Sequence, residues 1–283
     1  MEGTCALCHN YSELLESHRI PKFVTRAIKK HSFTKRLRNA SDPNKPVQDS
    51  DKDYLLCTTC EKKFGKKETL FNQKVLQPFR SKRIISFNYD EWLHYFITSV
   101  SWRTLYYDVM EADQLLERGF NEKSIPAIKQ AEQNMREYLL GEKKFLENID
   151  NHIVFIHEEN VLNNSSYDYS TFCNGAFGYL YGQKSTGSLY VLHVLAGIMI
   201  VSIIKKSPVE RWKNTFVKME PGKIKSTQIV SSPVIGELEY QKEQIAKAMK
   251  NMSKSQQEEL IKKIENDPEG FLKSSSAIKY KGQ

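Results

Sequence analysis

The 283-residue sequence lacks several features that define large classes of proteins. It opens Met-Glu-Gly-Thr with no apolar signal segment, which predicts a cytoplasmic protein. Its longest apolar run, residues 189–204, has 16 residues and includes His193, fewer than the ~20 residues that cross a bilayer. We therefore expect a buried helix or strand pair there and no membrane span. The sequence also has no phosphate-cradling glycine-rich loop and no nucleophile elbow.

Cysteine is scarce, but its spacing is informative. Four of the 5 cysteines form two Cys-x-x-Cys pairs, Cys5 with Cys8 and Cys57 with Cys60. A disulfide framework is typical of short secreted domains, and a thioredoxin-like redox site needs one such pair in a βαβ pattern, which is absent. Two pairs instead predict a structural Zn²⁺ site with four thiolate ligands. Cys173 stands alone and is expected to be a buried thiol.

The positive charge is concentrated near the N-terminus. The net charge is +8; residues 1–80 contribute +7 and the other 203 residues +1. Residues 19–38, called the basic run below, contain no acidic residue. Such a run indicates a surface that binds the phosphates of DNA or RNA, and the alternative is a solvated helix face without a partner. Its basic members are Arg19, Lys22, Arg26, Lys29, Lys30, Lys35, Arg36 and Arg38.

The hydrophobic periodicity and the positions of proline and glycine predict an α+β fold in three parts. Residues 1–78 are expected to form a zinc-bound treble-clef (ββα) module, residues 79–272 a mostly helical domain with a few buried strands, and residues 273–283 a flexible tail. Residues 39–53 read as a loop because they are polar and contain two prolines. The expected helices are 61–76, 92–116, 125–146, 236–252 and 254–265, and 153–156 is the expected buried strand.

A histidine motif lies between the two cysteine pairs. Ser17-His18-Arg19-Ile20-Pro21 follows the first pair, and Glu61 follows Cys60 directly. This order resembles the HNH (His-Me finger, treble-clef) endonuclease family over about residues 5–75. In the zinc-containing version of that family, an Asp-His-x-x-Pro run and a Leu-Cys-x-x-Cys-His run occupy the same places. The resemblance implies a zinc-held ββα module that hydrolyses phosphodiesters with a second, catalytic divalent ion.

Carried over residue by residue, the resemblance makes His18 the general base and the four paired cysteines the zinc ligands. Two positions depart from the family. Glu61 replaces its metal-binding histidine, and Ser17 replaces an acidic ligand; an asparagine before Leu55 is also missing. A carboxylate binds Mg²⁺ or Mn²⁺ through oxygen, so Glu61 is the candidate ligand of a catalytic metal.

Two hypotheses follow for function. In the first, the protein is an HNH-like nuclease acting on DNA or RNA; the resemblance suggests an effector of bacterial phage defence. In the second, the zinc module is catalytically silent and binds nucleic acid or a protein partner. His18 then only orients a turn, and Glu61 only stabilises a helix N-terminus. Residues 79–272 carry no recognised motif and are expected to bind a protein partner or to self-associate.

Overall fold

A small antiparallel sheet begins the fold. The computed structural model describes residues 1–39, 42–157, 161–162 and 170–280. The sheet has the order β1-β2-β5 and consists of β1 (Glu2–Thr4), β2 (Tyr11–His18) and β5 (Lys52–Cys57). Between β2 and β5 lie α1 (Lys22–His31) and the short pair β3 (Leu37–Arg38) and β4 (Pro46–Val47).

The helix expected at 61–76 is present and longer than predicted. It comprises α2 (Thr58–Phe71), a π-helical turn η1 (Asn72–Leu76) and α3 (Gln77–Lys82). We expected Pro78 to end this part of the chain. Pro78 instead lies in the first turn of α3, a position that proline tolerates, and the helix continues to Lys82.

A four-stranded antiparallel sheet forms the centre of the molecule. Its order is β7-β11-β10-β9, from β7 (Asp150–Phe155), β9 (Ala176–Gln183), β10 (Ser188–Leu195) and β11 (Ile198–Lys205). The apolar run 189–204 is thus a strand pair. Its two turn residues have positive φ, 55° at Ala196 and 94° at Gly197, as a tight hairpin turn requires. No helix in the described ranges is long and apolar enough to span a membrane.

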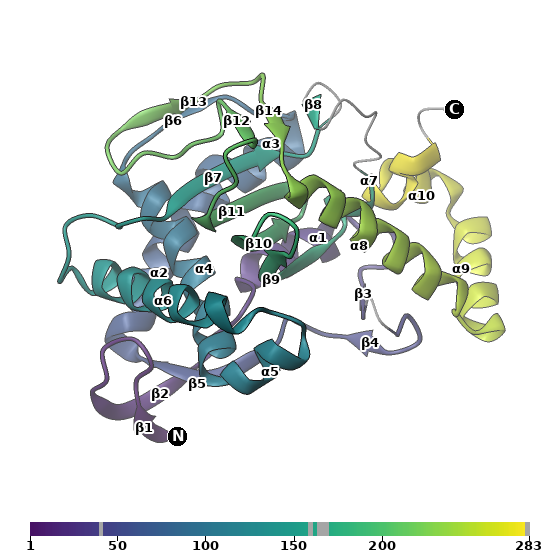
Figure 1. The fold of residues 1–283 in the computed structure, drawn as a ribbon. Helices are drawn as coiled ribbons and strands as arrows, with labels where there is room; N and C mark the ends of the chain where they lie inside the picture. The colour runs from purple at the N-terminus through teal and green to yellow at the C-terminus, as the bar shows by residue number, and fades with distance from the viewer. Residues whose placement is uncertain (40–41, 158–160, 163–169, 281–283) are drawn as a thin grey trace.

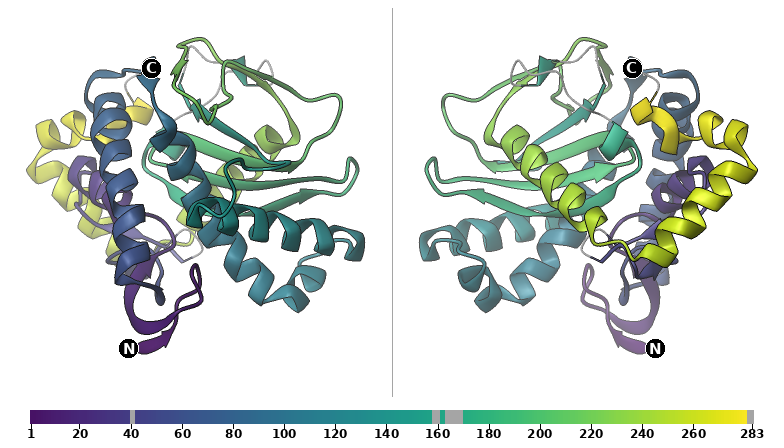
Figure 2. Two further views of the ribbon diagram at one scale, coloured as in Figure 1. Left: turned by 90° about the vertical axis from the view of Figure 1, so that its left-hand side faces the viewer. Right: turned by 90° about the vertical axis from the view of Figure 1, so that its right-hand side faces the viewer.

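Helices cover both faces of this sheet (Figures 1 and 2). Alternate residues of β7 face opposite ways, because side chains alternate along a strand. Ile153 and Phe155 join the core that includes Phe96 of α4 (Glu91–Met110), whereas Val154 joins the core that includes Val234 of α8 (Pro233–Lys250). Coverage on both faces explains why β10 and β11 read as one unbroken apolar run.

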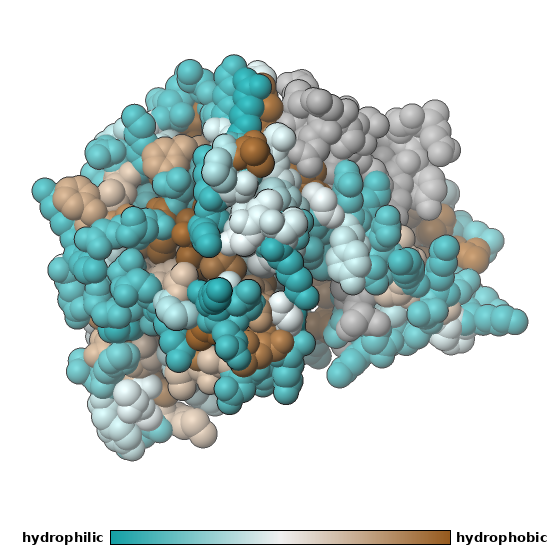
Figure 3. Space-filling view, viewed as in Figure 1, coloured by the Kyte–Doolittle hydropathy of each residue, from teal (hydrophilic) through white to brown (hydrophobic). Residues whose placement is uncertain are grey.

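The other elements surround this three-layer arrangement. Helices α6 (Ile125–Leu140) and α2 both pack on α4. Strand β6 (Phe87–Tyr89) pairs with β13 (Gly222–Ile224), and a third sheet has the order β12-β14-β8, from β12 (Arg211–Lys213), β14 (Ile229–Ser231) and β8 (Val161–Leu162). The remaining helices are α5 (Ala112–Glu117), η2 (Glu122–Ser124), α7 (Ser170–Cys173), α9 (Lys254–Asn266), α10 (Pro268–Lys273) and η3 (Ser275–Tyr280). Hydrophilic residues dominate the face shown in Figure 3, and hydrophobic ones lie mostly in recesses between elements.

Three features differ from the sequence-based expectations. The part after residue 78 is mixed helix and strand, with the central sheet at its heart, and was expected to be mostly helical. An apolar core also runs across the expected boundary at residue 78, joining Phe71 to Phe96 and Ile153. The helix expected to reach residue 146 ends at Leu140, because Gly141 adopts a left-handed conformation with φ of 87° and caps it.

The expected flexible tail, 273–283, also has defined contacts. Ser275 Oγ donates a hydrogen bond to the carbonyl of His31 (2.9 Å), and Phe33 N donates one to Ser276 Oγ (3.1 Å). Ala277 is fully buried. Residues 281–283 lie outside the described residues. The C-terminal segment therefore packs against the end of α1.

Candidate functional site

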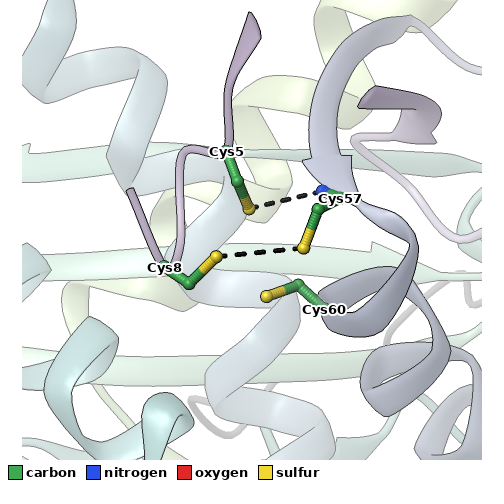
Figure 4. Close-up of side chains that lie close together, drawn as sticks. All are labelled: Cys5, Cys8, Cys57 and Cys60. Carbon is green, nitrogen blue, oxygen red and sulfur yellow. Dashed lines mark hydrogen bonds between the residues drawn. The ribbon is translucent and has the colours of Figure 1, made fainter. Parts of the chain in front are cut away.

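The four paired cysteines converge on one point (Figure 4). Cys5 and Cys8 lie in the turn after β1, Cys57 ends β5, and Cys60 lies in the first turn of α2. Their sulfur atoms all lie within 4.8 Å of one another. The Sγ atoms of Cys8 and Cys57 are 3.8 Å apart, and Cys57 N donates a hydrogen bond to Cys5 Sγ (3.3 Å). Cys173 is buried elsewhere in the fold, as expected.

This geometry fits a metal such as zinc. A tetrahedral zinc with Zn–S bonds of about 2.3 Å places its sulfurs about 3.8 Å apart, which matches the Cys8–Cys57 separation. Burial raises the pKa of Cys60. Burial also acts to raise the pKa of Cys57, but hydrogen bonds from the Cys60 backbone and from the neighbouring thiols lower it to about 7. A thiolate, which is the metal-binding form, is thus favoured at Cys57.

Strand β2 ends with the first two residues of the histidine motif, Ser17 and His18, and side chains alternate along a strand. Ser17 is buried and donates a hydrogen bond through Oγ to Glu61 Oε2 (2.7 Å). The two positions that the resemblance assigns to metal ligands therefore face each other. Glu16 points away to solvent and pairs with Lys52. No hydrogen bond or ion pair joins His18 to Glu61 within the described ranges.

His18 contacts a carboxylate that the sequence did not single out. Its Nε2 lies 3.2 Å from Asp49 Oδ2, and the two side chains are only 14% and 22% exposed. Asp49 accepts further hydrogen bonds from Thr25 Oγ1 (2.6 Å) and Ser50 N (3.0 Å). Burial acts to raise the pKa of Asp49, but these hydrogen bonds and His18 lower it below its ordinary value. Asp49 is therefore an ionised acceptor that holds His18 in place.

A buried arginine connects this site to the central helix. Arg103 of α4 is 1% exposed and donates through Nη1 to the carbonyl of His18 (2.8 Å) and through Nη2 to Glu68 Oε1 (2.5 Å). It also donates through Nε to the carbonyl of Ser99 (3.3 Å). Arg103 thus fixes the end of β2 against α2.

Most of the basic run contacts the protein itself. Arg19 stacks on Tyr107 and lies 3.5 Å from Asp53, and Lys22 lies 3.7 Å from Asp49. Lys29 and Lys35 donate to backbone carbonyls (both 2.7 Å). Arg36 and Arg38 contact Glu259 and Gln256 of α9. In the described part of the chain, Arg26 and Lys30 are the two whose side chains make no hydrogen bond or ion pair.

Asp49 and Arg103 were not predicted from the sequence. Asp49 is one of several aspartates in a polar loop, and nothing local marks it. Arg103 had a usable signal: it is a charge within an apolar helix, and such a charge is buried only when it is paired. A second group of three or more metal-binding side chains does not come together in the described residues. Comparisons with protein-family models, curated proteins and solved structures find no match to this chain.

Proposed function

We propose that the protein is a metal-dependent nuclease of HNH type, hydrolysing phosphodiesters of DNA or RNA on a zinc-stabilised N-terminal module. The observation that carries the proposal is the contact between His18 and Asp49, one residue along β2 from the residue that bonds to Glu61, Ser17. The resemblance predicts a base at position 18 and ligands at positions 17 and 61. The Ser17–Glu61 hydrogen bond and the His18–Asp49 contact support this proposal.

His18 acts as the general base. Its Nε2 donates to the ionised Asp49, so that Nδ1 carries a lone pair and accepts a proton from water. Deprotonated water then attacks phosphorus, and the bond to the leaving oxygen breaks. Asp49 is a positioning residue, because it sets the tautomer and the ring orientation of His18. Arg103 has a related role, since it holds the backbone carbonyl of His18.

Glu61 and Ser17 would supply the oxygen ligands of the divalent ion. Mg²⁺ is commonly held by one or two carboxylates together with waters and substrate phosphate, so this small donor set suits Mg²⁺ or Mn²⁺. An ion held by these residues would stabilise the charge that develops on the phosphate and on the leaving oxygen. Ser17 keeps the Glu61 carboxylate oriented through its hydrogen bond of 2.7 Å.

The silent-module alternative has one observation in its favour. The Ser17 hydroxyl already uses one Glu61 oxygen, and the described residues form no group of three metal-binding side chains beyond the cysteines. In that case the module binds nucleic acid or a protein without cutting.

One experiment separates the two functions. Purified protein is incubated with plasmid DNA and with RNA in Mg²⁺ or Mn²⁺, as wild type, His18→Ala and a control, His31→Ala, which removes a histidine outside the site. Cleavage that is lost in His18→Ala and kept in the control supports the nuclease. Cleavage insensitive to His18→Ala, or no cleavage with either ion, favours the silent module.

A further inference from the structure

Helix α2 presents a row of lysines to solvent. Lys62, Lys63 and Lys66 are exposed, and no hydrogen bond or ion pair holds their side chains in the described part of the molecule. The buried residues of α2, Cys60, Phe64 and Phe71, lie on its opposite side. In the left-hand view of Figure 2, α2 and its continuation run up the front of the molecule in dark blue.

The acidic residues of α2 do not neutralise this face. Glu61 is bonded to Ser17, and Glu68 is bonded to Arg103. The lysines also repel one another, because Lys62 and Lys66 lie one helical turn apart on the same face. A face that combines like charges without counterions is complementary to a polyanion.

Gly65 adds an open position on the same helix. A Cβ at this residue would meet nothing within 4 Å, so no packing contact requires glycine there. Glycine in a helix interior lowers helix stability relative to alanine, and it allows a ligand to approach the backbone closely. Gly65 is one turn from Glu61 and directly precedes Lys66, between the candidate site and the lysines.

The basic run differs from the α2 lysines in that most of its side chains are already held by other groups of the protein. Six of the eight basic residues of that run contact the protein's own groups. Two of the six, Arg36 and Arg38, are held by α9. Lys62, Lys63 and Lys66, which no such contact holds among the described residues, are therefore more available to phosphates than these six residues.

We propose that the phosphate backbone of DNA or RNA binds along the exposed face of α2, through Lys62, Lys63 and Lys66, and passes Gly65 on its way to Glu61. The inference rests on the proposed function for its partner, a nucleic acid, and adds the surface that binds it. It does not require cleavage.

Binding is measured in the full-length His18→Ala protein, so that cleavage does not interfere. Fluorescence anisotropy follows labelled 20-nucleotide single strands and duplexes of DNA and RNA over a series of salt concentrations. The test variant adds Lys62→Gln, Lys63→Gln and Lys66→Gln. The control adds Lys250→Gln, Lys254→Gln and Lys262→Gln, three exposed lysines of α8 and α9 with the same change of charge. Zinc content and thermal unfolding confirm that both variants fold.

The α2 variant is expected to bind about tenfold or more weakly at 0.1 M salt. Its slope of log K against log salt falls in magnitude by about 2 to 3, because three phosphate contacts are lost. The control is expected to bind within about twofold of its parent. Equal losses in both variants, no binding by the parent, or a larger loss in a third variant, Arg26→Gln/Lys30→Gln, would overturn the inference. Cleavage by the wild-type protein, assayed separately, tests the proposed function on its own.

Discussion

Replacing Arg103 with methionine tests the contact that joins helix α4 to the N-terminal part that carries the four cysteines. Methionine has a similar length and no charge, so it removes the hydrogen bonds to the His18 carbonyl and to Glu68 with little change in volume. The variant leaves Glu68, only 18% exposed, without its cation. The loss of one partner from a buried ion pair costs about 3–5 kcal/mol. Because Glu68 keeps some solvent contact, we expect about 3 kcal/mol.

The partner variant makes the test specific. Glu68→Leu leaves Arg103 charged and buried, and it is expected to cost at least as much. In the double variant Arg103→Met/Glu68→Leu no unpaired charge remains, so it should cost far less than the sum of the two single variants, which is about 6 kcal/mol or more. A residual cost of about 1 kcal/mol remains, because the His18 carbonyl has lost its donor.

The assay is urea unfolding of the zinc-loaded proteins, followed by circular dichroism and by tryptophan fluorescence. If both signals change at the same urea concentrations, unfolding is two-state and its free energy can be calculated from them. A cost below about 1 kcal/mol for Arg103→Met, or strictly additive costs in the double variant, would refute the view that this ion pair anchors β2.

Three further outcomes are expected. Cys57→Ser should lose the bound metal in elemental analysis, whereas Cys173→Ser should retain it; retention in both would contradict the four-cysteine site. The lowered pKa of Asp49 means that its ionised form stabilises the fold above pH ~4 and that this contribution is lost as the pH falls through the folded-state pKa. The stability difference between wild type and Asp49→Asn in urea unfolding should thus shrink below pH ~4, and a constant difference would be the contrary result. Gly65→Ala should raise the free energy of unfolding by about 0.5–1 kcal/mol, and a decrease would reveal an unseen steric conflict.

Local patterns predicted the parts of the structure that depend on local physics. Each Cys-x-x-Cys pair lies in a single turn or at a helix start, so its spacing was enough to predict the cluster of four thiols. Three residues of the short β-branched run at 153–156, residues 153–155, lie in β7. The apolar run at 189–204 was ambiguous between a helix and a strand pair, because a segment covered on both faces has no polar alternation to reveal its period.

Contacts between distant parts of the chain were not predictable. Asp49 reaches His18 because the chain before β5 returns along β2, and the four aspartates of residues 39–53 offered no basis for choosing one. Arg103 donates a hydrogen bond to the carbonyl of His18, which lies 85 residues away along the chain. The charge of the basic run follows from the sequence, but the contacts of its side chains do not. Arg36 and Arg38 contact groups of α9 that lie more than 200 residues away along the chain.

The most direct test of the account is the single-turnover rate of phosphodiester cleavage by wild type and His18→Ala at saturating Mg²⁺ or Mn²⁺. Loss of a general base costs about 10²–10⁴-fold, so the account predicts a rate at least about a hundredfold lower in the variant, with zinc content unchanged. Equal rates in the two proteins, or no cleavage of DNA or RNA by the wild type, would contradict it.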